Sequence, residues 1–371
     1  EIVIADSSEP PSLAAMSARA RVIATTVGPY ATHGMPLVEA CALVGTHYCD
    51  LTGEVLFVRD SADSWHDIAQ ESGAKIVHAC GFDSIPSDLG VLVTANKVAA
   101  DGEGALTRTV LSVRSLKGGL SGGTIDSMRQ QTIIARTEPG AQKVLDDPYA
   151  LSPDRAAEPP APKPEAPRTD LVGRVTSVMT AARKSLPVQR DPRTGRWTGP
   201  FIMASFNTRI VRRSNALMGW RYGRAFTYRE VMDFGDSPKA PILATGMTAG
   251  LLGLVAGMSY ATSRSMLDRV LPKPGDGPSE ERRAAGRFLM LITTRSTTGA
   301  DYATTVGADY DPGYDGTAVM LGETALALAM DDDLPDAAGV LTPATALGMP
   351  LVERLRSRGF TFDCDRGTAA S

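Results

Sequence analysis

Short apolar runs alternate with stretches of helical spacing along the first hundred residues. The apolar runs have the length of strands buried on both faces, and the stretches between them repeat their hydrophobic positions with the helical period. Gly45 and Gly73 each follow a helical stretch, where glycine commonly ends a helix. The expected strands and helices are, in order, Ile2–Ala5, Ser12–Ala20, Arg21–Val27, Pro36–Val44, Thr46–Leu51, Ser61–Ser72 and Ala74–Cys80. This alternation predicts a doubly wound, Rossmann-type α/β domain with a parallel sheet.

The opening of the chain lacks one part of such a domain. A doubly wound dinucleotide fold begins with a strand, a G-x-G-x-x-G turn and a helix whose N-terminus holds the pyrophosphate. No such turn occurs before residue 28, and the chain opens on a strand-like run. We therefore expect the N-terminal end of the fold to be missing, so that the sequence begins at the third strand. The alternative is a protein that binds no dinucleotide.

The pattern changes after residue 100. Long strand-like runs rich in Thr, Val and Leu occupy Leu106–Leu116, Arg224–Phe234 and Phe288–Thr298. A tight turn at Gly299 joins the last of these to Tyr302–Gly307, and strands joined in this way must be antiparallel. The sequence thus predicts a second, α+β domain built on an antiparallel sheet that carries the substrate surface.

These patterns give a domain organisation. Residues 1–100 form the C-terminal part of the dinucleotide-binding domain, and residues 101–330 form the α+β substrate and dimerisation domain. Inside the latter, 150–170 is a Pro-rich flexible loop and 240–263 is a weakly apolar helical segment. Residues 331–371 are a C-terminal helical segment and tail.

Composition narrows the function classes. The 371 residues are 43% hydrophobic and 22% charged, which fits two globular domains, and the net charge of -4 argues against a nucleic-acid binder. The four cysteines form no CxxC pair and no metal-ligand spacing, so we expect reduced thiols in a cytoplasmic protein without a metal. The run 240–263 is long enough to cross a bilayer, but its Gly, Ala, Ser and Thr content favours a packed helix, a homodimer contact or peripheral contact with the inner membrane.

The carboxyl ends of the predicted parallel strands hold the candidate cofactor residues, because open α/β sheets bind ligands there. One strand ends in Thr26-Val27-Gly28-Pro29, and another in Cys80-Gly81-Phe82. Asp6 either accepts a hydrogen bond from an adenine amino group or caps its own turn. Tyr30 and Asp83 are the catalytic candidates: the Tyr30 phenol as proton donor, and Asp83 as an acid or base. For both, packing or capping is the alternative.

Two further segments are candidate substrate-binding sites. The glycine-rich stretch 118–124 offers backbone N–H groups for an oxyanion or phosphate, with Ser121, Gly122 and Thr124 as ligands, or is a plain connection. Asn207, Arg209 and Arg212 are read as a polar strand that recognises a pantetheine phosphate or an acidic carrier surface. The alternative for this cluster is a solvated basic strand edge.

Several motifs carry a family resemblance. They are VGPYATHGMPLVEACALVGTHYCDLTGE, CGFDSIPSDLG, GGLSGGTIDSM, FNTRIVRRSNAL, PKPGDGPS and GVLTPATALG. Together they resemble the saccharopine dehydrogenase-like oxidoreductases, and within them an actinobacterial branch of enoyl reductases that act in trans. One departure is His33, where an aromatic residue is expected.

The resemblance implies NADPH as cofactor and a glycine-rich turn upstream of the sequence. It also implies carrier-bound polyketide or fatty acyl thioesters of lipid biosynthesis as substrates, with an acyl carrier protein or polyketide synthase as partner. Two other functions remain open: a saccharopine-type amino-acid-linked dehydrogenase, and a catalytically inactive scaffold associated with the membrane.

Overall fold

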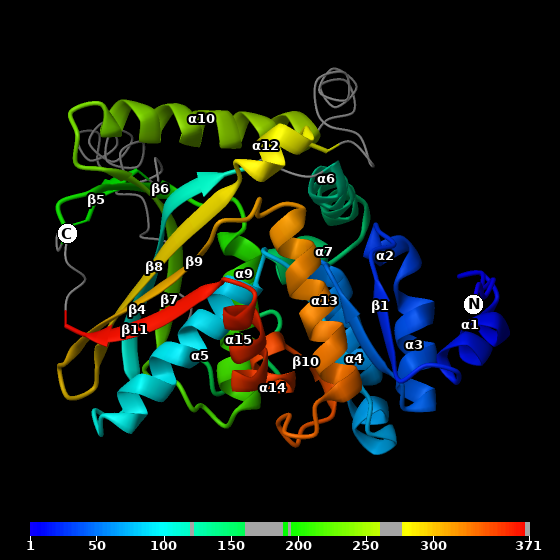
Figure 1. Cartoon of the computed structure of the whole chain (residues 1–371). Coiled ribbons are helices and arrows are strands. Elements are labelled where there is room, and N and C mark those ends of the chain that lie inside the picture. Colours follow the sequence, from blue (N-terminus) through cyan, green and yellow to red (C-terminus); the bar gives the residue numbers. More distant parts are fainter. Residues whose placement is uncertain (119–121, 160–187, 192–193, 260–276, 368–371) are drawn as a thin grey trace.

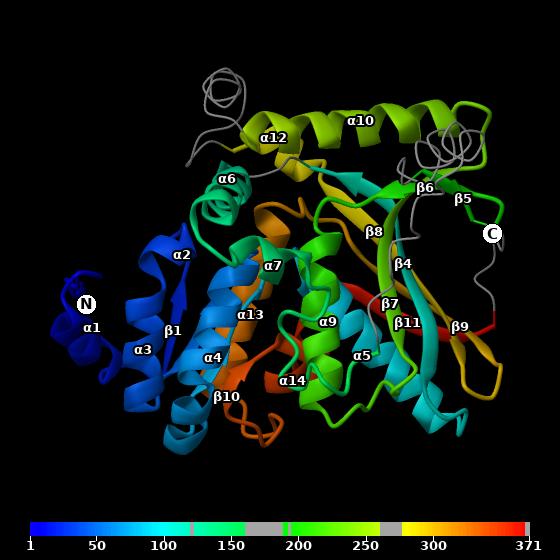
Figure 2. The same cartoon turned by 180° about the vertical axis from the view of Figure 1, so that it is seen from behind.

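The computed structural model describes residues 1–118, 122–159, 188–191, 194–259 and 277–367. It contains two sheets, which Figures 1 and 2 show.

The first sheet is fully parallel. Strands of the first sheet follow the order β1-β2-β3-β10. Its elements in chain order are α1 (Pro10–Ser17), β1 (Val22–Thr25), α2 (Tyr30–His33), α3 (Met35–Val44), β2 (His47–Asp50), α4 (Val55–Ser72), β3 (Lys75–Val77), α13 (Asp315–Met330) and β10 (Gly339–Leu341).

Helices cover both faces of this sheet, as the doubly wound prediction requires. Helices α3 and α4 pack against its strands and each other, while α13 packs against β1 and β2. Gly45 and Gly73 end α3 and α4 with φ of 84° and 80°, so both predicted caps are confirmed. Helix α4 begins at Val55, six residues before its predicted start at Ser61, because Val55, Phe57 and Val58 are buried.

Two predictions about this sheet are wrong. Residues Ile2–Ala5 form no strand: the segment pairs with no other, and Ile2 and Ile4 are 94% and 92% exposed. The C-terminal region is also more than a helical tail. Strand β10 pairs with β3, so the chain returns to the first sheet after leaving it for more than two hundred residues.

The second sheet has seven strands in the order β11-β9-β8-β4-β7-β6-β5. All neighbours pair antiparallel except β4 and β7, which are parallel, so the sheet is mixed. The predicted β8–β9 hairpin around Gly299 is confirmed. Strands of this sheet are β4 (Leu106–Lys117), β5 (Gln189–Arg190), β6 (Trp197–Pro200), β7 (Thr227–Gly235), β8 (Arg287–Ser296), β9 (Asp301–Ala308) and β11 (Thr361–Arg366).

The core lies between the two sheets. Helix α5 (Ile85–Ala100) is buried along most of its length; β8, β9 and β11 pack on one side of it, and α9, α14 and α15 on other sides. Gly90 permits this close approach, since a Cβ there would lie 2.5 Å from Ile292 Cδ1. The remaining helices are α6 (Gly122–Thr137), α7 (Ala141–Asp146), α9 (Ala204–Leu217), α10 (Ala240–Ser259), α12 (Glu280–Ala284), α14 (Pro343–Ala346) and α15 (Gly348–Ser357).

Helix α10 crosses one end of the second sheet, beside β6, β7 and α6 (Figure 1). Ala240, Ala244 and Thr248 are buried on its packed face. The rest of its surface includes four apolar side chains, Ile242, Leu243, Met247 and Leu252, each at least half exposed. Within the described residues, no helix has both the length and the apolar character needed to cross a bilayer.

Candidate active site

A cavity of about 290 Å³ opens at the carboxyl ends of the parallel strands. Its walls come from the segments that follow β1, β2 and β3, from helix α6 and from the start of α13. Of the residues predicted to bind cofactor or catalyse, those lining the cavity are Thr26, Gly28, Pro29, Tyr30, Gly81, Phe82 and Asp83. The structure therefore brings together two predicted segments that are separated by about fifty residues of sequence.

Three other predicted cofactor residues lie outside the cavity lining. Val27 is 63% exposed, and Cys80 is buried with its thiol against the Val77 carbonyl oxygen, 3.3 Å away. The Asp6 carboxylate accepts hydrogen bonds from the backbone N–H and hydroxyl of Ser8, at 2.8 and 2.7 Å. Asp6 thus takes the turn-capping role that was its alternative.

Glycines shape the cavity walls. A Cβ at Gly28 would meet only Tyr30, at 3.7 Å, so the backbone there is open to an approaching ligand. A Cβ at Gly81 would lie 2.9 Å from Leu51 Cδ2 and 3.1 Å from Thr317 Cγ2. This strand-end arrangement fits part of a dinucleotide, because a ligand there can reach backbone groups directly. None of the described residues that line the cavity is basic.

Asp83 presents a half-buried carboxyl group to this cavity. Within the described part of the chain, no hydrogen bond or ion pair holds that carboxyl. Burial raises the pKa of Asp83 to about 6, because the charged form loses hydration. A carboxyl group with this pKa, in reach of a bound ligand, can deliver a proton near neutral pH.

The Tyr30 hydroxyl, which was predicted as a proton donor, is held by two backbone groups. Its hydroxyl donates to the Thr25 carbonyl oxygen at 3.1 Å and accepts from the Leu51 backbone N–H at 3.2 Å. Burial and the charge of Asp50 raise the pKa of Tyr30 well above its usual value. Tyr30 thus ties the end of β1 to the end of β2, and its proton is already engaged by a backbone carbonyl group.

Helix α6 is fastened over the cavity through Glu54. This buried carboxylate accepts from the backbone N–H groups of Tyr30 and Ala31, at 3.0 and 2.7 Å, and from the Ser127 hydroxyl at 2.7 Å. Burial raises the pKa of Glu54. On the same helix, Gln131 donates to the Gly53 carbonyl oxygen at 3.1 Å. Gly122 is the first residue of α6, whereas Ser121 and the Thr124 side chain lie outside the described residues.

The predicted arginine cluster lies elsewhere. Asn207, Arg209 and Arg212 stand on helix α9 rather than on a strand, so the predicted polar strand is wrong. Arg209 donates to the Asp147 carbonyl oxygen at 3.0 Å and Arg212 to the Pro148 carbonyl oxygen at 2.8 Å. None of the three lines the cavity, and both guanidinium groups hold the chain that follows α7.

Asn207 belongs to a polar cluster in the core. It donates to the Glu230 carboxylate at 3.0 Å and lies near Ser87. Burial raises the pKa of Glu230 to about 7, and that of the nearby buried Asp88 also to about 7. The cluster titrates near neutrality but has no place in the cavity lining.

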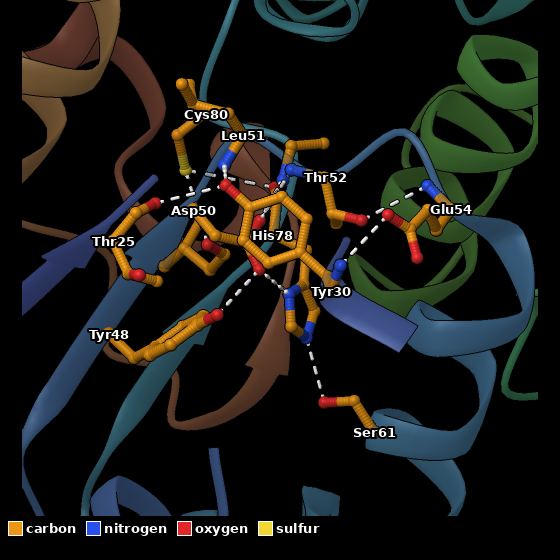
Figure 3. A network of polar contacts seen from close by, with 12 residues as sticks. Thr25, Tyr30, Tyr48, Asp50, Leu51, Thr52, Glu54, Ser61, His78 and Cys80 are labelled. Carbon is orange, nitrogen blue, oxygen red and sulfur yellow. Dashed lines mark hydrogen bonds and ion pairs between the residues drawn. The ribbon is translucent and has the colours of Figure 1, made fainter. Parts of the chain in front are cut away.

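Sequence analysis missed a second buried feature. Asp50, His78 and Ser61 form a hydrogen-bonded chain behind the cavity wall (Figure 3). The sequence signal for this chain was His78, which lies near the end of the apolar run Ala74–Cys80, because a buried imidazole requires hydrogen-bond partners.

Comparisons with known proteins identify relatives along almost the whole chain. A trans-acting enoyl reductase of Mycobacterium tuberculosis is 48% identical over 369 residues, covering 98% of this chain and 85% of the relative. Trans-acting enoyl reductases of Mycobacterium bovis and Mycobacterium ulcerans are 44% and 45% identical over 370 residues, with the same coverage. No established family model matches the chain.

Among solved structures, saccharopine dehydrogenase of Saccharomyces cerevisiae aligns with a TM-score of 0.48 and 10% identity, over 98% of this chain and 88% of that one. The sequence relatives confirm the enoyl reductase resemblance, and as reductases they imply a nicotinamide cofactor. The chain belongs to the trans-acting enoyl reductases, and it is an oxidoreductase.

Proposed function

We propose that this protein is an NADPH-dependent enoyl reductase that acts in trans on polyketide or fatty acyl thioesters held by a carrier. The observation that supports this proposal is the half-buried carboxyl group of Asp83, which has no hydrogen-bond or ion-pair partner among the described residues and faces a cavity at the carboxyl ends of the parallel strands. Reduction of an enoyl thioester needs a proton at the α-carbon after hydride reaches the β-carbon. Asp83 supplies the proton, and a bound nicotinamide supplies the hydride.

The chain's own residues prepare the site for this reaction. Gly28 and Gly53 leave backbone open on two walls, where a cofactor can approach closely. Leu51, Phe82 and Met203 give part of the cavity an apolar lining that suits an acyl chain. Asp83 stays protonated up to about pH 6 and donates from its carboxyl oxygen to the α-carbon.

The choice of NADPH over NADH rests on the family resemblance. Among the described residues, no basic side chain lines the cavity, which disfavours an amino-acid substrate whose carboxylate would need a cationic partner. The exposed apolar side chains of α10 add a surface suited to a lipid-like acyl substrate, to peripheral contact with a membrane, or to a second copy of the chain. The proposed protein partner is an acyl carrier protein or polyketide synthase.

The direct test is reduction of enoyl thioesters followed by nicotinamide absorbance. The protein should oxidise NADPH in the presence of an enoyl group on an acyl carrier protein, and more slowly with the same acyl group on a small thiol. NADH should be the poorer cofactor. Absence of turnover with either nucleotide, in protein shown to bind NADPH, would refute the enoyl substrate while keeping the cofactor.

A further inference from the structure

One buried carboxylate connects two walls of the cavity. Asp50 ends β2, and its side chain is fully buried. Its Oδ2 accepts from the Tyr48 hydroxyl at 2.9 Å and from His78 Nδ1 at 2.7 Å, and its Oδ1 accepts from the backbone N–H groups of Thr52 and Ala79, at 3.0 and 3.1 Å (Figure 3). Four donors thus satisfy both oxygens, so the group is fixed in one orientation.

The two backbone donors belong to different walls. Thr52 lies between Leu51 and Gly53, which line the cavity from the β2 side. Ala79 begins the segment after β3 that leads to Gly81 and Asp83 on the other wall, and the Asp50 carbonyl oxygen also accepts from the Cys80 N–H at 2.7 Å. Movement of the Asp50 side chain would therefore move both walls.

Ala79 shows how much the second wall depends on this contact. Its φ is 64°, in the left-handed region that residues with a Cβ seldom adopt. This conformation turns the chain sharply after β3 and directs it toward Asp83. Such a conformation persists only where the surroundings impose it, and here the hydrogen bond from the Ala79 N–H to Asp50 does so.

His78 and Ser61 complete the chain of contacts. His78 Nε2 lies 2.8 Å from the Ser61 hydroxyl oxygen, and this contact keeps Nδ1 directed at Asp50. The serine, histidine and aspartate order matches that of hydrolase triads, but all three residues have no exposed surface and none lines the cavity. With no access for a substrate, the serine cannot act as a nucleophile.

We propose that the Asp50–His78–Ser61 chain is a positioning device for the reduction, which sets the spacing between the Gly53 wall and the proton donor Asp83. A Cβ at Gly53 would lie 3.6 Å from Asp83 Oδ2, so the two walls meet closely where the donor stands. A small displacement of either wall would misplace the carboxyl relative to the α-carbon. This inference rests on the proposed function.

The first test is Asp50→Asn, which keeps the shape but replaces one acceptor oxygen by an amide N–H. With an enoyl thioester, kcat should fall by about tenfold or more while KM changes little, since alignment rather than binding is lost. The matched control is Thr94→Val, which removes a buried hydroxyl contact to Thr304, at 2.6 Å, outside the cavity. Equal kcat values for the two variants, measured where both are folded, would overturn the proposal.

Two histidine variants give a rescue test. His78→Asn places an amide N–H near the position of Nδ1 and should retain most of the activity, whereas His78→Leu should lose it. Ser61→Ala, a mild change, should lower kcat by a smaller factor and serves if the other variants do not fold. Equal kcat values for His78→Asn and His78→Leu would overturn the positioning role. If Asp50→Asn does not fold, an unchanged kcat in Ser61→Ala would overturn it.

Amide hydrogen exchange separates this inference from the proposed function. In Asp50→Asn, exchange should accelerate in residues 51–54 and 79–84 and stay unchanged in the β8–β9 hairpin. If the protein fails to reduce enoyl thioesters but shows this local change, the activity is wrong and the wall-positioning role stands. Faster amide exchange over the whole chain would instead show that Asp50 contributes to global stability and does not set the spacing of the walls.

Discussion

The carboxyl group of Asp83, which has no partner in the described part of the chain, predicts how turnover depends on pH. Burial raises its pKa to about 6, so half of the molecules carry the donor proton near that pH. If Asp83 protonates the α-carbon, the rate of the chemical step falls about tenfold for each pH unit above the pKa. Asp83→Asn removes the donor and should lower the rate near pH 6 by about 100-fold or more, the loss typical of a positioned acid.

The difference between wild type and variant should narrow as the pH rises. Two units above the pKa, about one Asp83 in a hundred is protonated, so the two proteins should then differ only a few-fold. The measurement is single-turnover decay of nicotinamide absorbance across this range, with Asp309→Asn, an exposed carboxyl outside the cavity, as control. A wild-type rate that does not change with pH, or an Asn variant within a few-fold of wild type near pH 6, would refute Asp83 as the donor.

Three further changes test other parts of the structure. Tyr30→Phe removes both hydrogen bonds of the hydroxyl and should lower the free energy of unfolding by about 1–3 kcal/mol with only a few-fold loss of turnover; a 100-fold loss at unchanged stability would restore its donor role. Gly81→Ala should lower Tm because its Cβ would lie 2.9 Å from a leucine methyl, whereas Gly28→Ala, with 3.7 Å of clearance, should raise only the Kd of NADPH; equal Tm values for the two would contradict this. Asp88 and Glu230 have folded-state pKa values of about 7, above their unfolded-state values. The contribution of these two carboxyl groups to the free energy of unfolding is therefore full below about pH 4. It is lost as the pH rises through about 7, by up to about 3–4 kcal/mol for each group. In Glu230→Gln, the free energy of unfolding, measured with urea at a series of pH values, should fall less steeply as the pH rises. An unchanged dependence on pH would show that Glu230 does not cause the fall.

Local sequence signals predicted much of the fold. The α/β alternation and the caps at Gly45 and Gly73 depend on neighbouring residues, and the structure confirms them. Strand β10 could not be found in this way, because three apolar residues form a strand only when β3 is already there to pair with. Ile2–Ala5 shows the converse, since an apolar run without a partner stays unpaired.

The sequence predicted where the cavity lies but not the contacts that its residues make. Gly28, Gly81 and Asp83 were predicted as site residues because ligand sites of open α/β sheets occur at strand ends, and the structure places all three on the cavity wall. Distinguishing Asp83 from Tyr30 requires knowing that the tyrosine hydroxyl donates to the Thr25 carbonyl oxygen at the end of β1. Arg209 was misassigned because a run of mixed polar and apolar residues fits a strand and a helix almost equally over a short window.

The late strands have a consequence for biosynthesis. β10 and β11 lie close together near the C-terminus, yet one completes the parallel sheet and the other forms the edge of the mixed sheet. Neither sheet can be finished until residues 339–366 have emerged from the ribosome. The nascent chain therefore carries two incomplete sheets with unpaired edges through most of its synthesis, and a premature stop anywhere before β10 leaves both of them open to aggregation.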